Sequence, residues 1–181
     1  MRTSAQKRMI EHICQTTFDL LYDRYYDEIT VRQICEEADI NRSTFYHYFE
    51  DKYELLYDLT VYVTEDLFYN KRALDHSTIF ENFIYYIDDN RKNFKHLLTS
   101  SKKEDIFRNL SQITSSLILK GVETNRGDPL TLKIKSSSHP NLMADFYGSG
   151  LIEVLRRWVE NDYHYAVDQI FEALHETLFE K

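Results

Sequence analysis

The chain has 181 residues and a mass of 21.8 kDa, a size that suits one or two compact domains. Hydrophobic residues make up 43% of it, enough for a core, yet no run approaches the roughly 18 to 20 apolar residues of a membrane span. With only 4 Gly and 2 Pro, the chain is expected to form long elements with few loops. We therefore predict an all-α protein of about nine helices.

The first helix is predicted over about Ser4 to Tyr22, where apolar residues recur at spacings of three and four. The N-terminal residues lack the apolar core of a signal peptide, so we expect a cytoplasmic protein. Cys14 and Cys35 occupy apolar helical positions and are interpreted as small buried hydrophobic residues. A disulfide between them is the open alternative.

The most informative segment runs from Thr30 to Lys52, TVRQICEEADINRSTFYHYFEDK. It predicts two short helices joined by a tight turn. Thr30 and Gln33, three residues apart, have the pattern of a capping box at the start of the first helix. Asn41 is expected to cap the second helix.

The second short helix separates apolar from polar side chains. Phe45 and Phe49 are four residues apart and form its buried side. The other side carries six hydrogen-bonding side chains: Arg42, Ser43, Thr44, Tyr46, His47 and Tyr48. Such a helix suits the major groove of DNA, where the second helix of a helix-turn-helix lies.

The chemistry of these side chains predicts particular DNA contacts. Arg42 can donate two hydrogen bonds to guanine O6 and N7. Ser43 and Thr44 can bond a base or a phosphate, and the two tyrosine hydroxyls suit phosphate oxygens. Lys52, at the start of the next helix, is expected to hold a phosphate together with the free N–H groups there.

Charge limits how strongly this segment can bind DNA. The net charge is −8, and residues 1–52 hold seven Lys or Arg against ten Asp or Glu. DNA affinity depends on Lys and Arg that neutralise phosphate, so binding needs a locally basic face. The candidates for that face are Arg2, Lys7, Arg8, Arg32, Arg42 and Lys52. We therefore predict modest, salt-sensitive affinity per subunit, strengthened by dimerisation.

A second domain is predicted after the first helices, with residues 1–52 binding DNA and residues 53–181 binding an effector and a second subunit. Residues Arg126 to Pro140 contain both prolines and a Ser-Ser-Ser run, and predict one long loop. Two final helices are expected at about Leu142–Glu160 and Tyr163–Phe179.

The N-terminal stretch resembles the TetR family of transcriptional regulators. The matching segments, in order and spacing, are Ile13 to Phe18, Tyr26 to Val31 and Arg42 to Lys52. The resemblance implies that bases are faced by Arg32, Arg42, Ser43 and His47, and that phosphates are contacted by Thr30, Thr44, Tyr46, Tyr48 and Lys52. For Arg32, simple exposure to solvent is the alternative. Tyr25 and Asp39 depart from the pattern, because glycine is usual at both positions.

The segment FYGSGLIEVLRRWVEND, with the amphipathic helix after it, resembles the C-terminal part of a subgroup related to dihydroxyacetone-kinase regulators. In the TetR family the last two helices pair with those of a second subunit. The resemblance therefore implies a homodimer whose interface is formed by Leu151, Val154, Leu155, Trp158, Val167, Ile170, Leu174 and Leu178. The alternative is that these residues pack within one chain.

Aromatic residues are abundant, with 14 Tyr and 11 Phe. The candidates for lining an effector cavity between the middle helices are Tyr62, Phe83, Tyr86, Phe107 and Phe146, although aromatic residues at helical spacing more often form a core. The 7 His show no metal-binding spacing. No nucleophile pattern, glycine-rich phosphate loop or carboxylate pair is evident, so we expect no metal, no cofactor and no catalytic residue.

Together, the residues and the resemblance predict a homodimeric DNA-binding regulator, a repressor of palindromic operators that a small-molecule effector releases. The expected partners are double-stranded DNA, a second copy of the chain and an unknown effector, without a membrane. Two alternatives stay open: a co-regulator that acts through a protein partner, which the net acidity favours, and a helical small-molecule carrier or enzyme.

Overall fold

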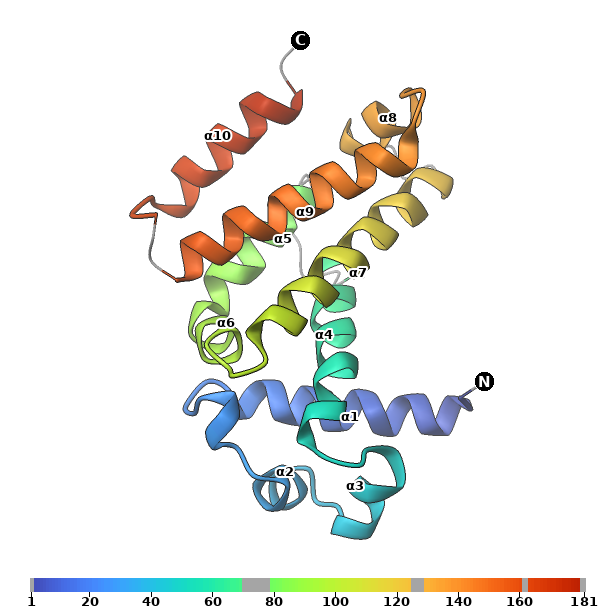
Figure 1. The fold of residues 1–181 in the computed structure, drawn as a ribbon, viewed down its shortest axis with the longest axis vertical. Helices are drawn as coiled ribbons and strands as arrows, with labels where there is room; N and C mark the ends of the chain where they lie inside the picture. Colours follow the sequence, from blue (N-terminus) through green and yellow to red (C-terminus); the bar gives the residue numbers. More distant parts are fainter. Residues whose placement is uncertain (1, 70–78, 125–128, 161–162, 180–181) are drawn as a thin grey trace. The chain divides into compact units, whose positions relative to one another are not determined.

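The computed structural model describes residues 2–69, 79–124, 129–160 and 163–179, except the side chains of 66–69, 79, 80, 82 and 177–179. These ranges form helices and no strand, which confirms the predicted all-α class (Figure 1). The helices are α1 (Ser4–Leu20), the 3-10 helix η1 (Tyr26–Glu28), α2 (Val31–Glu37), α3 (Arg42–Tyr48), α4 (Lys52–Tyr69), α5 (Ile79–Asp89), α6 (Arg91–Leu98), α7 (Lys103–Glu123), α8 (Pro129–Lys135), α9 (Pro140–Val159) and α10 (Val167–Phe179).

The chain divides into two compact units. Unit 1 comprises Met1–Val63 with Lys92–Asn109, and unit 2 comprises Thr64–Arg91 with Leu110–Lys181. Helices α4 and α7 each begin in unit 1 and end in unit 2. Unit 1 therefore holds the predicted helix-turn-helix together with most of α6 and the start of α7.

Helix α1 begins at a capping box and buries one stripe of side chains. The Thr3 hydroxyl accepts from the Gln6 amide at 3.2 Å, and the Thr3 amide donates to Gln6 Oε1 at 2.8 Å. The helix ends at Leu20, slightly before the predicted Tyr22. Cys14 on its buried side is a free thiol, as Cys35 is on α2, and burial raises the pKa of both. The interpretation of both cysteines as buried hydrophobic residues is confirmed.

A tight turn at Asp39 joins α2 to α3. The Ile40 amide donates to the Cys35 carbonyl at 3.0 Å and the Asp39 amide to the Glu36 carbonyl at 3.4 Å, the pattern of a Schellman motif. Asp39 has a φ of 50°, a left-handed conformation that aspartate tolerates better than most residues. The turn therefore keeps glycine-like geometry although residue 39 is an aspartate.

The core beneath α3 is aromatic, as predicted. Phe45 and Phe49 are 0% and 1% exposed, and their ring centroids lie 5.4 Å apart. Truncating a buried phenylalanine to alanine costs about 3–5 kcal/mol, so these two rings fix which side of α3 faces solvent. Asn41 occupies the predicted N-cap position of α3, but its side chain makes no capping hydrogen bond.

Helix α6 completes the core of unit 1. Asn93 Nδ2 donates to the Phe18 carbonyl at 2.7 Å, and His96 Nδ1 lies 2.7 Å from the Leu21 carbonyl. The ring of Phe94 packs edge-on against Phe18, with centroids 5.7 Å apart. Unit 1 thus has a core to which segments far apart in the sequence contribute.

The corner between α6 and α7 is bonded to Asp27 of η1. The Asp27 carboxylate accepts from the Ser101 amide at 2.8 Å, from Ser100 Oγ at 3.0 Å and from Ser101 Oγ at 3.3 Å. Burial raises the pKa of Asp27, but these hydrogen bonds and the charge of Lys52 outweigh it and leave the pKa below its ordinary value.

In unit 2, Trp158 near the end of α9 is fully buried. Its Nε1 donates to the Tyr165 carbonyl at 3.0 Å, and Arg91 donates to the Trp158 carbonyl at 2.8 Å while its guanidinium lies 4.6 Å from the indole centroid. Helices α7 and α9 approach closely at Gly148, where a Cβ atom would lie 2.7 Å from Ser115 Oγ.

Two predicted boundaries are wrong. Part of the predicted loop from Arg126 to Pro140 is helix α8, while residues 125–128 lie outside the described residues. Pro129 begins α8, where its missing N–H removes no helical hydrogen bond, and the buried side chains of this helix are Leu130, Thr131 and Ile134. The last helix starts at Val167 and not at the predicted Tyr163, and residues 163–166 are not helical.

Candidate nucleic-acid interface

Helices α2 and α3 form an open hollow on unit 1 with a volume of about 740 Å³. Its lining comes from α2, the turn and the start of α3: Arg32, Cys35, Glu36, Asp39, Ile40, Asn41 and Arg42. Two cationic and two anionic side chains therefore share this surface. It is polar, but it carries no excess of positive charge.

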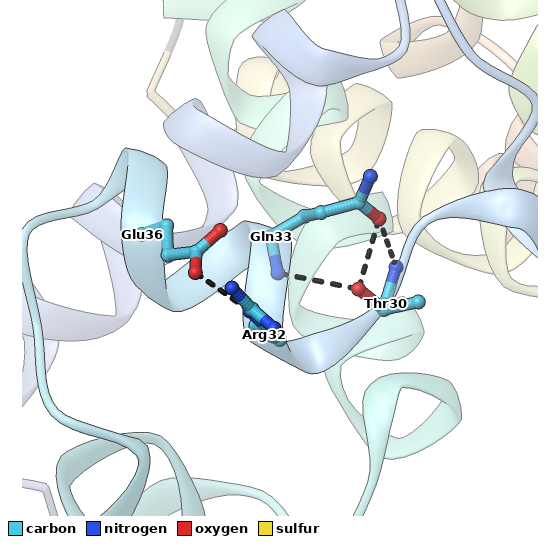
Figure 2. Close-up of polar contacts among 4 residues, drawn as sticks. All are labelled: Thr30, Arg32, Gln33 and Glu36. Atoms are coloured by element: carbon cyan, nitrogen blue, oxygen red, sulfur yellow. Dashed lines mark hydrogen bonds and ion pairs between the residues drawn. The ribbon is translucent and has the colours of Figure 1, made fainter.

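Figure 2 shows how the start of α2 is fixed. The Thr30 hydroxyl accepts from the Gln33 amide at 3.2 Å, and Gln33 Oε1 accepts from the Thr30 amide and hydroxyl, both at 2.9 Å. The predicted capping box is confirmed. Since the Thr30 hydroxyl takes part in this cap, a phosphate would compete with Gln33 for its proton.

Arg32 is paired with Glu36 one turn further along α2 (Figure 2). Arg32 Nε donates to Glu36 Oε1 at 2.7 Å, and the two side chains are 77% and 59% exposed. The hydrogen bond to Glu36, with the charge of its carboxylate, raises the pKa of Arg32. Exposed pairs of this kind contribute little to stability, so Arg32 can exchange its partner readily.

Helix α3 exposes its polar side, as predicted. Its exposed side chains include Arg42, Ser43, Tyr46 and His47, and its half-buried ones include Thr44 and Tyr48. Arg42 Nη2 donates to the Tyr46 hydroxyl at 3.4 Å, which raises the pKa of Arg42, and its guanidinium lies 5.8 Å from the Tyr46 ring centroid. Arg42 is thus held along α3, at the end where recognition helices contact base edges.

Lys52 has a bonding pattern that the sequence did not indicate. Its ammonium donates to the carbonyls of Tyr26 at 3.1 Å, Asp27 at 2.7 Å and Ile29 at 2.9 Å, and the Tyr26 hydroxyl donates to the Lys52 carbonyl. Burial lowers the pKa of Lys52, while the charge of Asp27 raises it. An ammonium has three donors, so a phosphate contact would require the loss of one of these bonds. Lys52 joins η1 to α4 in this structure.

The predicted basic face is less basic than the sequence suggests. Besides Arg32 and Lys52, Arg2 is also bonded within unit 1, to Asp58 through two hydrogen bonds of 2.6 and 3.0 Å. Lys7 and Arg8 are exposed on α1. With Arg42, which donates to the Tyr46 hydroxyl, four of the six candidate cations already have acceptors in the folded chain.

The five predicted effector residues do not form one site within either unit. Tyr62 and Phe107 belong to unit 1, and the other three to unit 2. Phe83 and Phe107 are 1% and 9% exposed and serve as core, whereas Tyr62 and Tyr86 are half-buried. Phe146 is 67% exposed in the single chain, and its place in an effector cavity stays a prediction.

The residues predicted for a dimer interface differ in how deeply they are buried within the single chain. Leu151, Leu155, Trp158 and Ile170 are at most 7% exposed and pack within unit 2, as the in-chain alternative expects. Val154, Val167 and Leu174 are half-buried, and the side chain of Leu178 lies outside the described residues. The exposed apolar side chains of α9 are instead Leu142 and Phe146. An open hollow of about 500 Å³ lies between Val154 and α10.

In the part of the chain that the structure describes, no helix is long and apolar enough to cross a membrane. The same residues contain no group of three or more His, Cys, Asp or Glu that could hold a metal ion.

An all-α chain with a helix-turn-helix near its N-terminus has the architecture of a DNA-binding transcription regulator. The sequence pattern of the bacterial regulatory proteins of the tetR family matches residues 13–59, and that of a transcriptional regulator C-terminal region matches residues 75–180. The chain belongs to the tetR family of transcription regulators, which are generally not enzymes. Its α2 and α3 are the DNA-binding helix-turn-helix of that family.

One curated protein is similar to part of the chain. It is 34% identical over 92 residues to the HTH-type dhaKLM operon transcriptional activator DhaS of Lactococcus lactis subsp. lactis (strain IL1403), covering 43% of this chain and 48% of that protein. The chain therefore matches about half the length of this relative.

Two solved structures share the fold. One is a dihydroxyacetone kinase operon activator DhaS, with 17% identity and a TM-score of 0.65 over 94% of this chain and 93% of that one. The other is a tetR-family transcriptional regulator from Streptomyces coelicolor, with 16% identity and a TM-score of 0.57 over 97% and 80%. At these identities the two structures show a shared fold, and membership of the tetR family rests on the two sequence patterns.

Proposed function

We propose that the chain is a homodimeric repressor that binds a palindromic operator in the cytoplasm and is released by a small-molecule effector. The observation that carries this proposal is the polar side of α3, which the buried rings of Phe45 and Phe49 hold toward solvent. Two such helices, related by a dimer axis, enter successive major grooves when they lie about 34 Å apart.

The proposed contacts follow from the chemistry and exposure of α2 and α3. Bases are faced by Arg32, Arg42, Ser43 and His47, and phosphates are contacted by Thr30, Thr44, Tyr46 and Tyr48. Arg42 carries most of the base preference, because an exposed guanidinium at the start of a recognition helix can bond guanine O6 and N7 together. Lys52 is not included, since its three donors are bonded to carbonyls.

The proposed dimer uses α9 and α10. Val154, Val167 and Leu174 stay available on these helices, and Leu142 and Phe146 add an apolar surface that a single chain leaves exposed. Sedimentation equilibrium of Phe146→Glu tests this surface, with Tyr57→Glu on α4 as the control for an exposed aromatic outside it. A Phe146→Glu protein that is as dimeric as the control would exclude Phe146 from the interface.

The effector is proposed to act among the helices of unit 2 and to change the separation of the two recognition helices. It can do so only through different affinities for the two separations. Activation is the alternative to repression, because the DhaS relative is named a transcriptional activator. Deleting the gene raises expression of the regulated operon if the protein represses and lowers it if the protein activates.

The decisive experiment for DNA binding is a gel shift with palindromes from the region upstream of the coding sequence. We expect a specific complex that survives excess competitor DNA at moderate salt. Binding that is equal for all sequences would refute the operator proposal.

A further inference from the structure

Acidic side chains on the DNA-binding surface have no place in the contacts proposed above. The hollow between α2 and α3 holds Glu36 and Asp39 beside Arg32 and Arg42. Asp39 is explained by the turn that it forms, with its φ of 50°. Glu36 is not explained by folding, because its side chain is 59% exposed and its ion pair with Arg32 lies on the surface of a single helix (Figure 2).

We infer that Glu36 determines specificity: its carboxylate accepts a hydrogen bond from the N4 amino group of cytosine in a correct operator and disfavours DNA that lacks this donor. The inference rests on the proposed function, since it requires that α2 and α3 bind DNA.

The first step of the argument concerns DNA of arbitrary sequence. Such DNA offers Arg32 phosphates but no guanine at a fixed position. An Arg32 that turns to a phosphate breaks its 2.7 Å bond to Glu36 and leaves that carboxylate without its partner. An unpaired carboxylate beside the phosphate backbone is repelled, and the repulsion is strongest at low salt. Sequence-independent binding is therefore weakened by Glu36.

The second step concerns a correct operator. The major groove presents guanine O6 and N7 as acceptors and cytosine N4 as a donor, and Glu is a natural partner for that donor. Arg32 and Glu36 are four residues apart on one helix and lie on the same side of it (Figure 2). Both side chains can then find a partner in the groove, Arg32 on guanine and Glu36 on cytosine, so neither charge is left unpaired.

The test compares Glu36→Gln with Glu37→Gln. Both variants lose one negative charge from α2, and both residues are exposed, but Glu37 does not line the hollow. Fluorescence anisotropy measures the affinity of each full-length protein for two duplexes, one selected by the wild type from a random pool and one scrambled, at 50 and 200 mM salt.

We expect Glu36→Gln to lower the ratio of selected to scrambled affinity about tenfold, the effect of losing one good base contact. Its affinity for the scrambled duplex should also fall about 3.5-fold more than that of the wild type between the two salt concentrations, because a freed Arg32 makes about one more phosphate contact. In an Arg32→Gln background this extra salt dependence should vanish. Glu37→Gln should leave both quantities at their wild-type values.

Equal behaviour of the two variants would overturn the inference, because net charge alone would then account for both. A pool selected by Glu36→Gln that keeps the same cytosine preference at every position would overturn it as well. A wild-type protein that binds neither duplex would instead refute the DNA-binding function on which the inference rests.

Discussion

Replacing Lys52 with methionine keeps the apolar part of the side chain and removes the ammonium that bonds three carbonyls. A hydrogen bond to a charged group contributes about 1.5–3 kcal/mol, so three of them amount to at least about 4.5 kcal/mol before costs. The ammonium gives up hydration on burial, and this lowers the pKa of Lys52 despite the nearby Asp27. This loss offsets part of the gain, and we expect Lys52→Met to lower the free energy of unfolding by about 2–3 kcal/mol.

Urea unfolding followed by circular dichroism measures this change, with an unaltered m value as evidence that the same surface unfolds. For a chain of this size the melting temperature should fall by about 5–10 °C. The matched control is Lys92→Met, because the Lys92 ammonium is half exposed and pairs with Asp23 at 3.5 Å on the surface. An exposed pair contributes at most about 1 kcal/mol, so the control should change little.

A Lys52→Met protein within about 0.5 kcal/mol of the wild type would refute this reasoning, because water would then satisfy the three carbonyls equally well. DNA binding of the folded variant gives an independent check. If Lys52 serves only unit 1, the salt dependence of binding stays unchanged. If the slope of log affinity against log salt concentration is instead smaller by about 0.9, Lys52 contacts a phosphate, as the sequence predicts.

Three further changes have defined outcomes. Gly148→Ala should destabilise the chain, because its Cβ would lie 2.7 Å from Ser115 Oγ and 3.1 Å from the Ser115 amide nitrogen. The Cβ of Gly150→Ala meets nothing within 4 Å, so this variant should gain up to about 1 kcal/mol of stability from helix propensity. Urea midpoints that move in the same direction for both variants would contradict this. Asp27→Asn should lower the urea midpoint at pH 7. The pKa of Asp27 is lower in the folded than in the unfolded chain, so the stability that its carboxylate contributes is lost as the pH falls through the folded pKa. The difference in urea midpoint between wild type and Asp27→Asn should therefore shrink below about pH 4. A constant difference down to pH 3 would argue against this role. Arg42→Ala should reduce discrimination about tenfold at one position of each half-site in a binding selection, and an unchanged selected sequence would show that Arg42 does not face a base.

The helices of the DNA-binding region were predictable because their determinants are local. Thr30 and Gln33 are three residues apart, and Phe45 and Phe49 are four apart, so spacing alone places the cap and the buried side. The ion pair of Arg32 with the residue four positions later could have been anticipated from the same rule.

Other features depend on information that spacing does not contain. The carbonyls that bind Lys52 come from residues 23 to 26 positions earlier in the chain, and no periodic pattern encodes such a contact. The sequence pattern does not predict helix α8, because a proline signals a loop and equally suits the first turn of a helix. The apolar pattern extends back to Tyr163 and so predicts too early a start for α10. In the structure the Ala166 amide donates to the Gln169 side chain, and the helix begins at Val167.

The composition of unit 1 from two separate stretches of sequence has a consequence for protein engineering. A hybrid regulator that joins this DNA-binding region to the effector domain of a relative would have to carry residues 92–109 along with residues 1–63. A fragment cut after residue 63 would leave Phe18 without Phe94 and Asp27 without the serines of the α6–α7 corner. A single crossover in the sequence therefore cannot transfer the whole of unit 1 to another regulator.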